Sequence, residues 1–96
     1  MDLGNFFLQE RLKINFTQRK VSQSVGISHS YLSLIEQNKT NPPLLTIDKL
    51  CKFYKKPMWL VFLTEIDVEN DILEDDRRKF LNLKLRIVDF YNEFYR

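Results

Sequence analysis

The chain has 96 residues, which is enough for one small domain and too few for a multidomain enzyme. Its composition, 44% hydrophobic and 29% charged, is that of a folded globular protein, and two glycines with three prolines are too few for the turns of a β-sandwich or barrel, so we expect an all-α fold. The net charge is only +2. A single cysteine and a single histidine exclude an intrachain disulfide, a four-ligand zinc site and the usual catalytic pairings. We therefore expect no metal, no cofactor and no enzymatic activity.

The N-terminal segment predicts a helix rather than a targeting signal. Residues 1–4 include an acid and no continuous apolar run, and no stretch of about 18 apolar residues occurs anywhere, so we expect neither a secretory signal nor a membrane span, and a cytoplasmic location. Over residues 5–14 the apolar side chains recur close to the three-and-four spacing of a helix face. They are Phe7, Leu8, Leu12 and Ile14.

Two short helices are predicted next, over residues 18–25 and 29–37. Thr17 can cap the first, because its hydroxyl can accept a hydrogen bond from an otherwise unpaired amide of the next turn. Gly26 can end that helix in the left-handed conformation, and Ser28 supplies a second cap. Two short helices joined by such a turn are the sequence form of a helix-turn-helix.

Two further helices are predicted after a loop. Asn38 tolerates the left-handed conformation, and the prolines of 39–43 exclude a helix there. One helix should then have Thr46 near its start and end before Pro57, which fits the first turn of the next helix. The apolar positions are Ile47, Leu50 and Tyr54 in the first of these helices, and Met58, Val61 and Phe62 in the second.

Charge is unevenly distributed along the chain. Residues 1–64 hold nine basic and four acidic side chains, residues 65–76 hold seven acidic and no basic ones, and residues 77–96 hold six basic and two acidic ones. A basic body indicates a polyanionic partner, whereas the acidic run is typical of a solvated connector. We therefore expect a domain over 1–64, an acidic connector over 65–76 and a C-terminal helix over 77–96.

The C-terminal segment predicts an amphipathic helix with more apolar surface than one core can cover. From Asp71 or Asp75 to Tyr95, apolar side chains cover an arc of about 220°, whereas docking on one core needs about 100°. A second copy of the chain is the simplest partner for the excess, with the helices over 44–62 as the alternative dimer interface. The candidate interface residues form a heptad-like stripe of Phe80, Leu83, Ile87, Phe90 and Phe94.

Residues 17–42, TQRKVSQSVGISHSYLSLIEQNKTNP, resemble the Cro/C1-type, or XRE, helix-turn-helix family of phage and bacterial repressors. The likeness covers about residues 3–63. It rests on the Thr-Gln opening, the glycine of the turn, the Ile-Ser pair, the Ser-Tyr-Leu-Ser run, the Ile-Glu pair and the Asn-Pro loop in that order. The resemblance implies a five-helix, lambda-repressor-like domain that places the 29–37 helix in the major groove of double-stranded DNA.

The resemblance also implies roles for individual residues. Arg11 and Glu36 match an ion pair that joins the first helix to the end of the DNA-reading helix, and Leu34 departs from the family, which commonly has a polar or basic residue there. Leu34 either touches a thymine methyl group or is ordinary surface, and His29 alone would be read as a surface histidine. The candidates for base readout are Ser28, His29, Ser30, Ser33 and Leu34, and those for phosphate contact are Thr17, Gln18, Tyr31, Lys39, Thr40 and Asn41.

Two functions fit the sequence. The first is a homodimeric transcriptional regulator, a repressor that reads a palindromic operator. The second is an antitoxin-like or other interaction protein, whose C-terminal region binds another protein while its helix-turn-helix serves autoregulation. A stoichiometric partner after purification would favour the second function.

Overall fold

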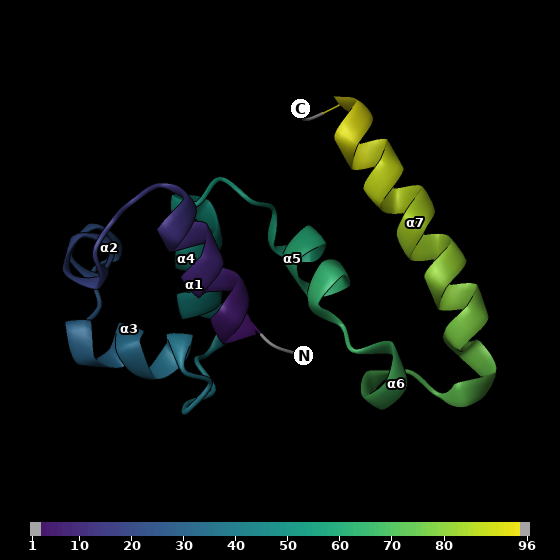
Figure 1. Ribbon diagram of the computed structural model, residues 1–96, viewed down its shortest axis with the longest axis horizontal. Coiled ribbons are helices and arrows are strands. Elements are labelled where there is room, and N and C mark those ends of the chain that lie inside the picture. The colour runs from purple at the N-terminus through teal and green to yellow at the C-terminus, as the bar shows by residue number, and fades with distance from the viewer. Residues whose placement is uncertain (1–2, 95–96) are drawn as a thin grey trace.

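The computed structural model describes the backbone of residues 3–94, with all their side chains except those of Thr64 and Phe94. Every regular element of this part is helical, which confirms the all-α prediction (Figure 1). The elements are α1 (Leu3–Lys13), α2 (Gln18–Val25), α3 (His29–Glu36), α4 (Leu44–Phe53), α5 (Met58–Glu65), α6 (Val68–Asp71), the 3₁₀ turn η1 (Glu74–Asp76) and α7 (Arg77–Phe94).

The predicted caps set the ends of α2 and α3. The Thr17 hydroxyl accepts a hydrogen bond from the backbone N–H of Lys20 at 3.1 Å, and the Ser28 hydroxyl accepts one from that of Tyr31 at 3.0 Å. Gly26 has a φ of 83°, a left-handed conformation that ends α2 without the steric cost of a Cβ atom. These contacts confirm the predicted helix-turn-helix, with α3 ending one residue earlier than expected.

Helices α1 to α5 surround one apolar core, and α5 lies between the α1–α4 group and α7 (Figure 1). The aromatic rings of Phe7 and Tyr54 stack in this core with their centroids 6.3 Å apart. Burying a side chain of this size contributes about 1.5–3 kcal/mol, so the cluster accounts for the docking of short helices that would be marginal alone. Its buried members are Phe7, Val21, Leu32, Ile35, Ile47, Leu50, Cys51, Tyr54 and Val61.

Helix α1 buries only part of the apolar set predicted for it, with Phe7 fully buried and Leu8 half-buried. It begins at Leu3, and Leu12 and Ile14 are 50% and 43% exposed. The contact with α3 is instead made where Gly4 approaches: a Cβ atom there would overlap the carbonyl oxygen of Ile35. Leu12 lies near the end of α1, and Ile14 lies just beyond it.

The acidic connector contains ordered turns, whereas its composition indicated a solvated linker. Asp67 caps α6 by accepting a hydrogen bond from the backbone N–H of Glu69 at 3.0 Å. The guanidinium of Arg77 donates to the backbone carbonyls of Glu69 and Ile72, at 2.6 and 3.2 Å. Local caps and one arginine therefore hold α6 against the start of α7.

The C-terminal helix begins where the expected segment 77–96 begins, and later than the start that the helical pattern indicated. Its first residue is Arg77, rather than Asp71 or Asp75. Ile72 has extended backbone angles, φ −116° and ψ 135°, which interrupt the helical path after α6. The predicted end at Tyr95 lies outside the described residues.

Candidate nucleic-acid interface

The outer side of α3 presents polar side chains away from the core. Ser28, His29 and Ser30 are exposed, while Leu32 and Ile35 on the opposite side of the same helix are buried. The hydroxyl of Ser28 already accepts the capping hydrogen bond from the backbone N–H of Tyr31. The start of α3 therefore offers small and planar polar groups on one accessible surface.

The second half of α3 is less polar on this side. Ser33 is half-buried, and its hydroxyl accepts a hydrogen bond from the side-chain amide of Gln37 at 2.8 Å. Leu34 is 41% exposed and offers apolar contact. Hydrogen-bonding capacity is thus concentrated in the first turn of α3.

The residues expected to contact phosphates occupy three places in the fold. Thr17 caps the start of α2, Tyr31 lies half-buried on α3, and the loop after α3 carries exposed Lys39 and Asn41 with Thr40 half-buried between them. The N-terminus of a helix carries a partial positive charge, which favours an anion near the start of α2.

Arg11 and Glu36 form the expected pair between α1 and the end of α3. The Nε atom of Arg11 lies 2.8 Å from Oε2 of Glu36, and its Nη2 atom lies 3.0 Å from Oε1. The two side chains are 12% and 2% exposed, so the contact is nearly buried. The hydrogen bonds to this carboxylate raise the pKa of Arg11, which stays charged. Arg11 also donates to the carbonyl of Phe16 at 2.9 Å and so fixes the turn before α2.

Gln18, which was expected to contact a phosphate, forms hydrogen bonds with two side chains of its own domain. Its Nε2 atom donates to Oε1 of Glu36 at 2.9 Å, and its Oε1 atom lies 3.0 Å from Nε2 of His29. A polar chain therefore runs from the buried carboxylate through α2 to the exposed start of α3. Sequence reasoning missed this chain, and its only local signal was a polar residue at the first position of both short helices.

Tyr54 lies buried next to the ion pair and was predicted only as a core residue. Its hydroxyl has no hydrogen-bond partner among the described residues. Burial, and then the charge of Glu36, raise the pKa of this phenol, so the side chain is neutral at physiological pH.

The residues of the predicted dimer stripe on α7 differ in their exposure to solvent. Phe80 and Ile87 are half-buried, whereas Leu83 and Phe90 are 51% and 56% exposed, and the side chain of Phe94 lies outside the described part. The difference arises because α7 turns a neighbouring face toward α5. There the rings of Trp59 and Tyr91 meet edge to face with their centroids 6.1 Å apart.

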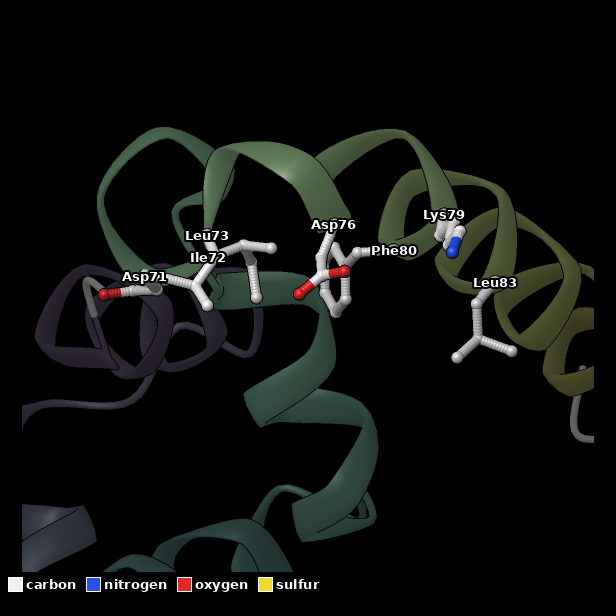
Figure 2. Close-up of a pocket in the computed structure, with 7 residues that line it drawn as sticks. All are labelled: Asp71, Ile72, Leu73, Asp76, Lys79, Phe80 and Leu83. Atoms are coloured by element: carbon white, nitrogen blue, oxygen red, sulfur yellow. The ribbon is translucent and has the colours of Figure 1, made fainter.

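An open hollow of about 470 Å³ lies where the connector meets α7. Figure 2 shows the side chains of Ile72, Phe80 and Leu83 projecting to the same side, with Asp71 and Asp76 near them. The exposed apolar surface of α7 therefore continues into a recess whose charged lining residues are Asp71, Asp76 and Lys79.

Within residues 3–94, none of the helices has the length and apolar character needed to cross a membrane. In the same part of the chain, no group of three or more histidine, cysteine, aspartate or glutamate side chains is placed to hold a metal ion.

Comparison with known proteins gives one family and two curated relatives. A family model described as helix-turn-helix matches residues 8–58, more than half of the chain. Over 51 residues the chain is 35% identical to the HTH-type transcriptional regulator PuuR of Escherichia coli (strain K12) and to that of Shigella flexneri. These alignments cover 53% of this chain but only 28% of each relative, so the chain matches less than a third of their length. No solved structure matches the chain at the same level of significance.

Proposed function

Because the chain belongs to the Cro/C1-type helix-turn-helix family, we propose that it is a sequence-specific DNA-binding transcriptional regulator that inserts α3 into the major groove. The observation that carries this proposal is the exposed polar surface at the start of α3, on a helix held by caps and a buried ion pair. The relatives are named as transcriptional regulators, and the basic character of residues 1–64 fits a polyanionic partner.

Base readout in this proposal falls to the first turn of α3. Ser28, His29 and Ser30 reach base edges, Ser33 lies one turn further along, and Leu34 contacts a thymine methyl group. A leucine cannot form the hydrogen bonds of a polar side chain, so its discrimination is limited to apolar contact. The strongest sequence preference is therefore expected opposite the helix N-terminus.

Phosphate contacts hold the domain in register in this proposal. The free N–H groups at the start of α2, near Thr17 and Gln18, bind one phosphate, and Lys39, Thr40 and Asn41 bind another from the loop after α3. Tyr31 adds a contact from the side of α3. Such contacts release counterions, so affinity falls steeply as salt rises.

The test is selection of DNA from a random duplex pool, followed by salt titration of the selected site. We expect one sequence to emerge, with an affinity that falls linearly in log salt. Lys39→Ala should lower that salt slope by about one. Lys52→Ala is the matched control, because Lys52 is paired with Asp48 on α4 at 2.9 Å, and it should leave the slope unchanged. Absence of any selected sequence would contradict the proposal.

We further propose that the regulator is a homodimer that represses from a palindromic operator, with α7 as the dimer element. Two domains would place their α3 helices in successive major grooves about 34 Å apart. The support is the exposed apolar surface of α7, including Leu83 at 51% and Phe90 at 56% exposure.

Sedimentation equilibrium of the full chain tests the dimer. Leu83→Glu should shift the chain toward monomer and weaken binding to a two-half-site operator, because it places a charge on the proposed interface. Leu12→Glu is the matched control, since Leu12 is equally exposed at 50% but lies on α1. A wild-type monomer, or dimerisation unaffected by Leu83→Glu, would contradict an α7 dimer and leave the surface of α4 and α5 as the alternative.

The second candidate function is an antitoxin-like interaction protein that also regulates its own promoter. The observation that favours it is the recess between the connector and α7, where apolar side chains lie beside Asp71 and Asp76. Such a surface, which Lys79 also lines, suits a segment of another protein that carries apolar side chains and charges complementary to these groups. Co-purification of a stoichiometric partner that Leu83→Glu releases would support this function, whereas a pure homodimer would contradict it.

A further inference from the structure

His29 is the single histidine of the chain and the first residue of α3. It is exposed, and its Nε2 atom lies 3.0 Å from Oε1 of Gln18. In a neutral histidine only one ring nitrogen carries a proton, and the groups that hydrogen-bond to the ring determine which one. Here the surrounding side chains determine that choice.

The chain of hydrogen bonds that leads to His29 starts at a buried carboxylate. Glu36 is held by the guanidinium of Arg11, with donor–acceptor distances of 2.8 and 3.0 Å, so it is ionised and can only accept hydrogen bonds. The end of Gln18 that faces Glu36 must therefore be the NH₂ group, as its 2.9 Å contact requires. The amide of Gln18 thus has one allowed orientation.

That orientation determines the proton on His29. The carbonyl oxygen of Gln18 faces the imidazole and can only accept, so Nε2 of His29 must donate. A neutral imidazole has one N–H group, and with that proton on Nε2 the Nδ1 atom keeps a lone pair. No described residue gives Nδ1 a hydrogen-bond partner.

We propose that Glu36, acting through Gln18, holds neutral His29 in the Nε2–H tautomer, so that Nδ1 reads a base that donates an amino hydrogen into the major groove. This inference rests on the proposed function of α3. The donors of that kind are N6 of adenine and N4 of cytosine. The opposite tautomer would instead donate to O6 or N7 of guanine, or to O4 of thymine. Glu36 and Gln18 are thus positioning residues, and His29 determines the specificity.

The first test is the tautomer of the free full chain, measured by long-range ¹H–¹⁵N NMR at pH 8, where histidine is largely neutral. One histidine gives one set of ring signals, so the assignment needs no variant. We expect the proton on Nε2, and we expect Gln18→Ala to shift the signals toward a mixture of tautomers. A proton on Nδ1 in the wild-type chain would overturn the proposal, whatever the DNA result.

The second test uses the selected operator at the same pH. His29→Ala should abolish the sequence preference at one base pair of the operator. That pair should present adenine or cytosine to α3, and two base analogues decide between them. Purine in place of adenine, or 2-pyrimidinone in place of cytosine, removes only the amino donor. The matching analogue should weaken wild-type binding by about 3- to 10-fold, the effect of one hydrogen bond. His29→Ala should bind the natural and the analogue sites alike.

Gln18→Ala separates positioning from phosphate contact. The variant should bind all sequences less well because it loses a phosphate contact. The ratio of its affinities for the natural and the analogue sites should also approach one, because the tautomer of His29 is no longer restrained. If no sequence is selected at all, the proposed function fails and this inference with it. If a site is selected and the His29-dependent base is guanine or thymine, or the ratio stays unchanged in Gln18→Ala, only this inference is overturned.

Discussion

Removing the carboxylate of Glu36 should destabilise the domain more than any change to a surface charge. The Glu36 side chain is 2% exposed and that of Arg11 12% exposed, so Glu36→Ala leaves a guanidinium charge in a largely desolvated position. The loss of one partner from a buried pair costs about 3–5 kcal/mol. That is a large part of the roughly 5–15 kcal/mol available to a small domain. With about 4–8 °C of melting temperature per kcal/mol at this size, the melting temperature should fall by about 12–40 °C.

Thermal unfolding followed by circular dichroism measures this effect. Asp48→Ala is the matched control, because the Lys52–Asp48 pair has a similar distance of 2.9 Å but its side chains are 77% and 34% exposed. Such pairs contribute about 0–1 kcal/mol, so this variant should melt within a few degrees of the wild type. If Glu36→Ala melts no lower than Asp48→Ala, the buried ion pair does not stabilise the fold.

A double variant separates charge from shape. Arg11→Met combined with Glu36→Leu removes both charges and keeps apolar volume, so it should be more stable than Glu36→Ala alone. If the double variant is instead less stable than the single one, the uncompensated charge of Arg11 is not what destabilises Glu36→Ala, and the hydrogen bonds of Arg11, such as that to the carbonyl of Phe16, matter more.

Three further predictions concern stability and reactivity. Tyr54→Phe should leave the free energy of unfolding in urea unchanged or raise it by up to about 1 kcal/mol, because the buried hydroxyl has no partner among the described residues. Gly4→Ala should destabilise the domain more than Gly26→Ala, because a Cβ atom at Gly4 would overlap a backbone atom. At Gly26 there is space for a Cβ atom, and the cost is only that of the left-handed φ of 83°, about 1–2 kcal/mol. Burial, and then the charge of Asp48, raise the pKa of Cys51 to about 11, above its ordinary value near 9. The protonated thiol therefore makes its full contribution to the free energy of unfolding below pH 9, and this contribution is lost as the pH rises toward 11. In urea titrations over this pH range, Cys51→Ala should lose less stability than the wild type.

Local chemistry explains why the helix-turn-helix could be predicted to within a residue. The caps at Thr17 and Ser28 and the left-handed Gly26 act within a few residues of the chain, so the sequence alone reveals them. Asn38 likewise has the left-handed φ of 57° that its residue type allows. Features of this kind do not depend on what lies across the core.

Features that depend on tertiary contacts could not be predicted from periodicity. Leu12 looked like a core residue because its spacing fits a helix face, but it lies near the end of α1 and is 50% exposed. Helix α6 has four residues, too few to show a period, and its cap at Asp67 lies inside a run of acids that resembles a linker. In both places the residue types agree with the structure, but the contacts that decide the outcome cannot be read from the local sequence.

The network around Glu36 shows how this small domain joins stability to its exposed surface. One oxygen of the carboxylate accepts from both Arg11 and Gln18, at 3.0 and 2.9 Å, and Gln18 continues to His29. The same buried charge that holds α1 to α3 therefore also orients an amide on α2 and, through it, the side chain that begins α3. A domain without room for separate supporting layers uses one ionised group for both purposes, because a group that only accepts hydrogen bonds determines the orientation of every donor around it.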